Sequence, residues 1–278
     1  MGRGNGTALI NFNGGTLRAT ASQTEYLSSL DGGFLPTGTA LTAANVEILG
    51  GGAVIDTNGF DVGTSVPFDG VGGLTKRGSG TLNLKGASTF AGATTVEAGV
   101  LRIDGSTLSS TTVKAGASLV GAGVVTNNVT IEASGTLSPG NSIGTFSVTG
   151  ALSIGGNLAV ETNNTNLADL VDVTGSVTLT GSSAISLSHL GGAPVNGDTF
   201  LIIRNDGADA INGQFSNLAD GSYVTIGGMT GLVDYQFDSL SGTLNVGNDL
   251  AIRIQPVPEP TAAALIGLGV IAIRRRRR

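Results

Sequence analysis

Short alternations of apolar and polar residues, each interrupted by glycine, dominate the middle of the chain. In residues 94–103, Val96 precedes a turn at Gly99, and Leu101 and Ile103 follow it. Successive side chains of a strand point to opposite faces, so these three apolar residues are predicted to face a core. The residues predicted to point the other way are Thr95, Glu97 and Arg102. The pattern therefore indicates two short, half-buried strands joined by a sharp corner.

The same alternation returns at residues 111–120 and 129–137. A period of ~17–20 residues is typical of a solenoid, in which each repeat buries its apolar face against the next. Glycine suits the corners between strands because it adopts positive φ angles, and the small Ala98 and Ala115 are expected to face a narrow interior. At ~20–25 residues a turn, the chain would form about ten to twelve turns of a parallel β-helix. A stack of antiparallel sandwich domains is the alternative.

The C-terminus follows a different pattern. A polar Val257-Pro258-Glu259-Pro260 is followed by an apolar run, predicted as a short α-helix over residues 261–273, and then by five arginines. This run spans roughly 20 Å, against about 30 Å of hydrocarbon in a bilayer, which favours temporary retention over a permanent span. Basic residues resist translocation, so they are expected to stay cytoplasmic while the preceding chain is outside. These membrane-orienting residues are Arg274, Arg275, Arg276, Arg277 and Arg278.

This order of segments resembles the PEP-CTERM sorting signal of bacterial envelope proteins. The resemblance implies export, transient retention in the inner membrane and processing by an exosortase. It also implies that recognition rests on Val257, Pro258, Glu259 and Pro260. A permanent tail anchor, with an intact C-terminus, is the alternative. Residues 1–6 lack the basic and apolar regions of a signal peptide, so we expect that the true start lies upstream.

A second resemblance covers the repeats. Residues 72–86, Gly-Gly-Leu-Thr-Lys-Arg-Gly-Ser-Gly-Thr-Leu-Asn-Leu-Lys-Gly, are similar to the autotransporter-associated β-strand repeat, which continues with an aromatic-Gly turn and a Thr-x-Val strand. Ala87-Ser88 and Phe90 are mild departures from the commoner Ala-Asn and Tyr. Residues 135–146 and the stretches 169–175 and 197–203 resemble later turns of the same passenger proteins. The resemblance implies a single-stranded right-handed parallel β-helix that forms an exported rod.

These patterns divide the chain into four predicted parts. Residues 1–70 hold the first β-helix turns, and residues 71–195 hold the β-strand repeat region. Aromatic residues become commoner in residues 196–255, which we interpret as C-terminal β turns or a cap, with room for antiparallel hairpins. Residues 256–278 form the sorting signal.

Composition excludes several classes of function. The sequence has no cysteine, which excludes disulfides and Cys-ligated zinc. Charged residues are 12% of the chain, about half the usual share. Without the five C-terminal arginines, nine Lys and Arg face twenty Asp and Glu, so the remaining chain carries a net charge of about −11. Such an acidic chain is not expected to bind nucleic acid, and no cofactor or metal site is predicted.

Candidate catalytic groups are few. His189 is the only histidine and is interpreted as a solvated turn residue. The pairs Asp169 with Asp172 and Asp206 with Asp209 are interpreted as turn residues that bind backbone amides. Ca²⁺ ligation by the second pair is an alternative, although no EF-hand spacing is present. The only lysines, Lys76, Lys85 and Lys114, form no cluster with arginine of the kind that a polysaccharide lyase needs.

The sequence therefore predicts a non-enzymatic, exported β-helix of the cell surface or extracellular matrix, with a structural or adhesive role. Its predicted partners are an exosortase-type enzyme, the membrane through residues 261–273 before processing, and extracellular polysaccharide. Two alternatives stay open. One is a polysaccharide-active β-helix enzyme, a lyase or glycoside hydrolase, and the other is a receptor that stays tethered to the membrane.

Overall fold

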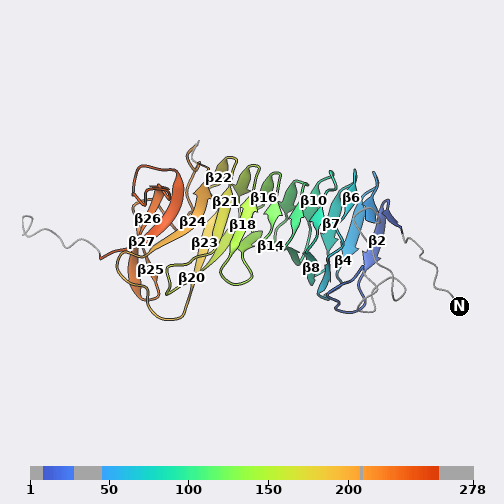
Figure 1. The fold of residues 1–278 in the computed structure, drawn as a ribbon, viewed down its shortest axis with the longest axis horizontal. Coiled ribbons are helices and arrows are strands. Elements are labelled where there is room, and N and C mark those ends of the chain that lie inside the picture. The colour runs from blue at the N-terminus through green and yellow to red at the C-terminus, as the bar shows by residue number, and fades with distance from the viewer. Residues whose placement is uncertain (1–8, 28–45, 207–208, 257–278) are drawn as a thin grey trace, which may run out of the picture.

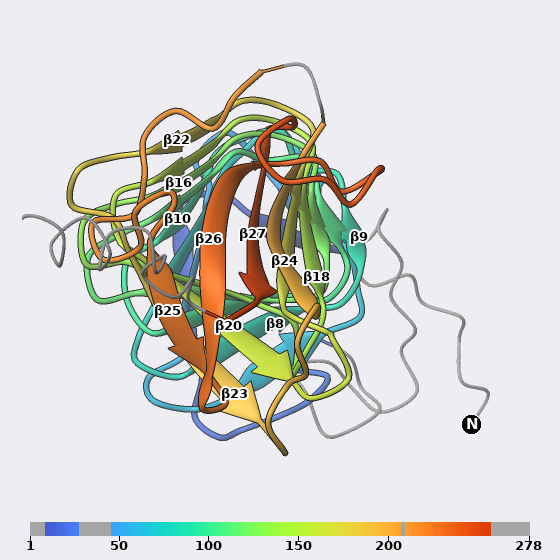
Figure 2. The same ribbon diagram turned by 90° about the vertical axis from the view of Figure 1, so that its left-hand side faces the viewer.

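The chain winds into a rod of stacked short strands. The computed structural model describes residues 9–27, 46–206 and 209–256. Three long sheets run along the rod, and each turn of the chain adds one strand to each of them (Figure 1). Seen along the rod, the three sheets form the sides of a coil (Figure 2). The fold is thus a parallel β-solenoid, as predicted, and the sandwich alternative is wrong.

The first sheet has eight parallel strands, in order β2 (Gly15–Arg18), β4 (Ala53–Asp56), β7 (Leu74–Arg77), β10 (Thr94–Val96), β13 (Thr111–Val113), β16 (Val129–Ile131), β19 (Leu152–Ile154) and β22 (Val177–Leu179). The second sheet has seven, in order β5 (Val62–Thr64), β8 (Thr81–Leu84), β11 (Val100–Ile103), β14 (Ser118–Gly121), β17 (Thr136–Pro139), β20 (Asn157–Asn163) and β23 (Ala184–Leu190). Because consecutive strands belong to different sheets, every turn crosses all faces of the rod.

The third sheet has nine strands and changes character along its length. Its parallel part consists of β9 (Ala87–Ser88), β12 (Ser106–Thr107), β15 (Val124–Val125), β18 (Thr145–Val148), β21 (Leu170–Val173) and β24 (Thr199–Asn205). Its antiparallel part consists of β27 (Asp249–Ile254), β26 (Met229–Phe237) and β25 (Tyr223–Ile226). A small parallel sheet at the N-terminal end holds β1 (Ile10–Phe12), β3 (Val46–Ile48) and β6 (Asp69–Gly70).

Because neighbouring strands are in register, inward side chains of similar type stack on one another from turn to turn. At one inward position of the second sheet, successive turns supply aliphatic side chains in register, and these are Val62, Leu82, Leu101, Leu119, Leu137, Leu158 and Ile185. The predicted core positions Val96, Leu101 and Ile103 are all buried. At the N-terminal end the rings of Phe12, Phe68 and Phe90 follow one another with centroids 6.3 and 6.5 Å apart. One apolar core therefore runs the length of the rod.

The number of turns is smaller than predicted. Thr94, Thr111 and Val129 are register partners on neighbouring strands, so the turns between them are 17 and 18 residues long, as the repeats predict. The prediction of ten to twelve turns is nevertheless wrong, because about six complete turns place a strand in all three long sheets, and the first sheet has only eight strands. Antiparallel strands take up much of the chain after residue 222, and later turns lengthen to 25 residues between Leu152 and Val177.

Corners between the first and second sheets depend on glycine. Gly99 and Gly116 occupy equivalent corners with φ of 67° and 76°, a region that other residues seldom adopt. The expectation that Ala98 and Ala115 face the interior is wrong, since Ala98 is half-buried and Ala115 is exposed. Both alanines lie in the corner itself, where the strand alternation has already ended, and Ala117 is the alanine that enters the core.

One inward position of the first sheet holds a lysine. The side chain of Lys76 is fully buried, and its Nζ donates to the carbonyl oxygens of Arg77, Gly78 and Ala98 at 3.0, 2.8 and 2.9 Å. Burial lowers the pKa of Lys76 to about 8, so the ammonium form still predominates at neutral pH. Because Ala98 belongs to the next turn, Lys76 links two turns at their corner.

Several predictions concern segments outside the described residues. These include the α-helix over residues 261–273, the sorting residues Val257, Pro258, Glu259 and Pro260, and the five terminal arginines. In the described part of the chain, no helix has the length and apolar character to cross a membrane.

Candidate functional site

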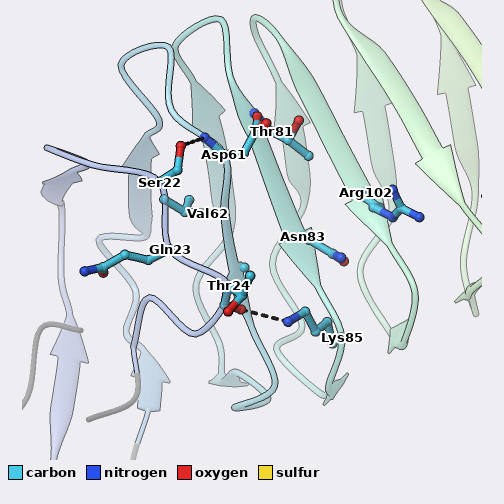
Figure 3. Close-up of a pocket in the computed structure, with 10 residues that line it drawn as sticks. Ser22, Gln23, Thr24, Asp61, Val62, Thr81, Asn83, Lys85 and Arg102 are labelled. Carbon is cyan, nitrogen blue, oxygen red and sulfur yellow. Dashed lines mark hydrogen bonds between the residues drawn. The ribbon is translucent and has the colours of Figure 1, made fainter. Parts of the chain in front are cut away.

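A polar pocket of about 350 Å³ lies on the outer face of the second sheet, near its N-terminal end (Figure 3). Its residues come from β5, β8, β11 and the segment at Gln23, which forms a parallel bridge with Val62 and so extends the sheet. The lining side chains include Ser22, Asp61, Thr81, Asn83, Lys85 and Arg102. Outward positions of neighbouring strands thus supply the pocket, which explains why it is polar.

The floor of the pocket is open because Gly63 has no side chain. A Cβ at Gly63 would lie 2.8 Å from the carbonyl oxygen of Thr24 and 3.3 Å from Cε of Lys85. Lys85 extends from β8 across this glycine, and its Nζ donates to Thr24 O at 2.7 Å and to Glu25 Oε1 at 2.9 Å. Burial alone would raise the pKa of Glu25, but hydrogen bonds from Ser65 and Lys85 together lower it.

Two side chains of the pocket retain unused hydrogen-bonding capacity. Asn83 donates from Nδ2 to Asp104 Oδ2 at 2.8 Å, while its buried Oδ1 accepts no hydrogen bond. Arg102 donates through Nε to Asp104 at 2.9 Å, and its other guanidinium nitrogens have no hydrogen-bond partner among the described residues. Partial burial would raise the pKa of Asp104, but bonds from Asn83, Asn141 and Arg102 outweigh burial and lower it. The pocket is therefore anchored by an ionised aspartate.

The charges of the pocket favour a neutral, hydroxyl-rich ligand. Lys85 and Arg102 are paired with Glu25 and Asp104, so the described lining residues offer no uncompensated cation to an anionic group. Asp61 accepts the backbone N–H of Thr81 at 2.9 Å and is the only carboxylate among the described lining residues. Paired carboxylates, which glycoside hydrolysis needs, are thus missing from this lining.

A second depression, near the C-terminal end, is lined by Asp172, Asp206, Asp238 and Asp249. Asp172 forms an ion pair with Arg204 on the neighbouring strand. The buried Asp249 accepts the N–H groups of Asn205 and Ser239 at 2.8 and 2.9 Å. Asp238 accepts from Leu240 N and Ser241 Oγ. These three carboxylates therefore hold loops and strands together.

No group of three or more His, Cys, Asp or Glu side chains that could hold a metal ion occurs within the described residues. The Ca²⁺ alternative for Asp206 and Asp209 gains no support from their surroundings. The backbone oxygen of Asp209 accepts bonds from Asn205 Nδ2 at 2.5 Å and from Asn248 Nδ2 at 2.8 Å, so side-chain amides already occupy it.

Asp169 and Asp172 have different roles. The buried Asp169 accepts the N–H groups of Gly144 and Glu161 at 2.9 and 2.8 Å, so it binds backbone amides as predicted. Asp172 lies in β21 and pairs with Arg204, so the interpretation as a turn residue is wrong for it. Burial raises the pKa of Asp169 to about 6, against the lowering effect of these two bonds.

The interpretation of His189 as a solvated turn residue is also wrong. His189 lies within β23, and its ring contacts Phe200 edge-on with centroids 6.4 Å apart. Nε2 lies 2.7 Å from the carbonyl oxygen of Gly192, which can only accept, so Nε2 carries the proton. Nδ1 lies 2.8 Å from Thr162 Oγ1. Both ring nitrogens are thus engaged in structural hydrogen bonds.

Comparison with known proteins identifies two segments. Residues 74–103, which form β7 to β11, match the passenger-associated-transport-repeat model. Residues 256–278 match the PEP-CTERM protein-sorting motif, which is found in exported proteins that are sorted to the cell surface and which implies exosortase processing. Both matches agree with the resemblances carried by the sequence.

Two curated proteins share similarity with the solenoid. An extracellular serine protease of Serratia marcescens is 33% identical over 198 residues, which is 64% of this chain and 19% of that protein. The adhesin BmaC autotransporter of Brucella suis biovar 1 (strain 1330) is 36% identical over 106 residues, which is 36% of this chain and 3% of that protein. The chain thus spans less than a fifth of the length of these relatives. Taken with the fold, the matches show that this chain is a β-solenoid with a passenger-associated transport repeat and a C-terminal PEP-CTERM sorting motif.

Proposed function

We propose that this chain is a non-enzymatic rod of the cell surface or extracellular matrix, with a structural or adhesive role, released from the membrane by an exosortase that recognises Val257 to Pro260. The observation that carries the proposal is the combination of a β-solenoid with a C-terminal sorting motif in one chain. The sorting motif brings the rod to the cell surface, and the rod presents polar strand faces along its length.

Adhesive contact is best supported at the pocket on the second sheet. Lys85 and Arg102 form ion pairs within the chain, while the outer nitrogens of Arg102 retain hydrogen-bonding capacity and Asp61 can accept further hydrogen bonds. Hydroxyl groups of an extracellular polysaccharide match such donors and acceptors. The described residues that line the pocket include no aromatic side chain to stack on a sugar ring, so the contact is expected to be weak and to gain strength from many rods acting together.

The polysaccharide-active enzyme is the weaker alternative. In the described depressions, Asp172, Asp238 and Asp249 are committed to structural bonds, and the imidazole of His189 is bonded at both nitrogens. General acid–base catalysis needs a carboxyl or imidazole group that is free to exchange a proton with the substrate. Depolymerisation of neutral or acidic glycans by the purified chain would favour the enzyme over the rod.

The sorting step is tested by Glu259→Ala, with Gln255→Ala as the control. Gln255 lies four residues upstream in the same stretch of chain. We expect Glu259→Ala to accumulate as a full-length precursor in the inner membrane, because the recognition residue is lost. Gln255→Ala should mature as the wild type does. Normal maturation of Glu259→Ala, measured by fractionation and mass spectrometry, would argue against recognition through this residue.

A further inference from the structure

Six charged side chains form one file along the first sheet, one on each successive turn, and their signs alternate. From the N-terminal end they are Arg18, Asp56, Arg77, Glu97, Lys114 and Glu132. Strand register places Asp56 between Arg18 and Arg77. We call this row the charge file. It ends after Glu132, since the next two turns place Gly155 and Thr180 at this position.

The charge file lies beside a low surface of small polar side chains. Two residues before each charge from the third turn of the file onward, the outward position carries a threonine, namely Thr75, Thr95, Thr112 and Thr130, and Ser153 and Thr178 continue this row on the next two turns. The charged side chains are accessible, with exposed fractions of 51% for Arg77 and 41% for Glu97.

An alternating file of six charges has a symmetry of its own. Its two ends, Arg18 and Glu132, have opposite signs, so reversing the file inverts every charge. Consider two copies placed face to face and related by a twofold axis that is parallel to the strands and passes between Arg77 and Glu97. This axis reverses the order of the charges in the second copy. It also places the charge file of one copy opposite the charge file of the other. The reversed file is therefore the electrostatic complement of the original, which is the condition for a self-complementary isologous interface.

We propose that this face of the rod pairs with the same face of a second copy of the chain, in antiparallel orientation. Arg18 then faces Glu132 of the partner subunit, Asp56 faces Lys114 of the partner subunit, and Arg77 faces Glu97 of the partner subunit. A parallel pairing about an axis along the charge file would instead place every charge opposite its own equivalent. Between the two twofold-symmetric pairings, the charge file thus favours the antiparallel one.

The pairing is expected to be weak because the interface is small. Five intervals of ~4.8 Å give the charge file a length of about 24 Å, which is short for an interface of about 800 Å² per partner. The two rods are expected to associate where copies are crowded, as on a cell surface, and to separate when salt screens the exposed charges. This inference does not depend on the proposed sorting or adhesion.

Two double charge swaps test the pairing while preserving the ion pairs within each chain. Lys114→Glu with Glu132→Lys reverses one end of the charge file, and Arg18→Glu with Asp56→Arg reverses the other. Each variant alone places like charges opposite one another at both ends of the antiparallel pair. Mixed together, the two variants are complementary at all six positions.

The readout is sedimentation of the full chain in detergent at low salt, with circular dichroism to confirm that both variants fold. We expect the wild type to dimerise, each variant alone to associate at least tenfold more weakly, and an equimolar mixture to recover the wild-type affinity. Association through the apolar C-terminal run would be the same in every sample. Variants that associate as the wild type does, or a mixture that shows no recovery, would overturn the proposal.

Cysteine cross-linking tests the direction, because the chain has no cysteine of its own. Thr16 and Thr130 lie beside the first and last charges of the file. In the antiparallel pair, Thr16→Cys of one copy faces Thr130→Cys of the other. A disulfide should therefore form in a mixture of the two single variants and in neither variant alone. A parallel pair would give the opposite result, with each variant cross-linking to itself.

Discussion

At the scale of single residues, Lys76 is a buried lysine whose ammonium group hydrogen-bonds backbone carbonyl oxygens inside the rod. Its position in the strand alternation points inward, where an aliphatic residue would ordinarily stack on Val96. The corner at Gly78 presents carbonyl oxygens inside the rod, and the ammonium group satisfies them. Three donors matched to three carbonyl acceptors make this burial tolerable.

We expect Lys76→Met to lower the free energy of unfolding by about 2–4 kcal/mol, because the carbonyls of Gly78 and Ala98 lose their donor. Lys114→Met is the control. Its ammonium group forms an ion pair with Glu132 at the surface, so the cost should stay below about 1 kcal/mol. Equal effects of the two variants in urea unfolding would show that the buried bonds of Lys76 do not stabilise the fold.

Asp169 should make stability depend on pH in a particular direction. Burial raises the pKa of Asp169 to about 6 in the folded chain, above the ordinary 3.8. The folded state then holds a proton that the unfolded state has released, so this contribution to stability is complete below about pH 4 and is lost as the pH rises through 6. The nearby Glu161 adds to the effect, because its negative charge also raises the pKa.

The comparison is between the wild type and Asp169→Asn, which cannot titrate. Between pH 4 and pH 7 the free energy of unfolding of the wild type should fall by about 2–3 kcal/mol relative to the variant. Stability curves of the two proteins that run parallel over this range would mean that the pKa of Asp169 is close to its ordinary value.

At the scale of elements, the sequence predicts the strands better than the corners that connect them. The period of two and the repeat of 17 to 18 residues identify the inward positions Val96, Leu101 and Ile103, since burial of alternate residues is a local property of each strand. Ala98 and Ala115 were misplaced because the alternation stops where a corner begins. The turn predicted at His189 is wrong because pairing with β20, whose Thr162 is distant in the sequence, extends strand β23 through His189.

The binding features could be predicted less well than the fold. The pocket needs Gly63, Asn83 and Arg102 on three different strands, and only the three-dimensional register shows that they are neighbours. The charge file had a signal in the sequence, since Glu97 and Lys114 follow equivalent Thr-x-Val segments. Aligning the repeats by those segments shows the alternation of sign.

The corners themselves can be tested with a matched pair of glycines. Gly99→Ala and Gly116→Ala both force alanine into a positive φ, which costs about 1 kcal/mol each. At Gly99 a Cβ would also collide with the backbone oxygens of Gly78 and Gly80, whereas nothing lies within 4 Å at Gly116. We expect Gly99→Ala to be less stable than Gly116→Ala by about 1–3 kcal/mol in thermal or urea unfolding. Equal losses would show that the turns are spaced more loosely than the structure indicates.

At the scale of the whole molecule, the two ends of the rod differ. Parallel strands stack from the N-terminal end, while the antiparallel strands β25, β26 and β27 occupy the C-terminal end (Figure 1). The last of these, β27, ends at Ile254, immediately before the sorting motif at residues 256–278. All the described strands therefore precede the motif, and removal of the motif would remove none of them.

The most direct test of exosortase sorting is the intact mass of the mature protein isolated from cells. We expect a C-terminus that lies within or just after residues 257–260, with the apolar run and Arg274 to Arg278 absent. A mature protein that keeps all five arginines would contradict exosortase processing and would favour a permanent membrane tether.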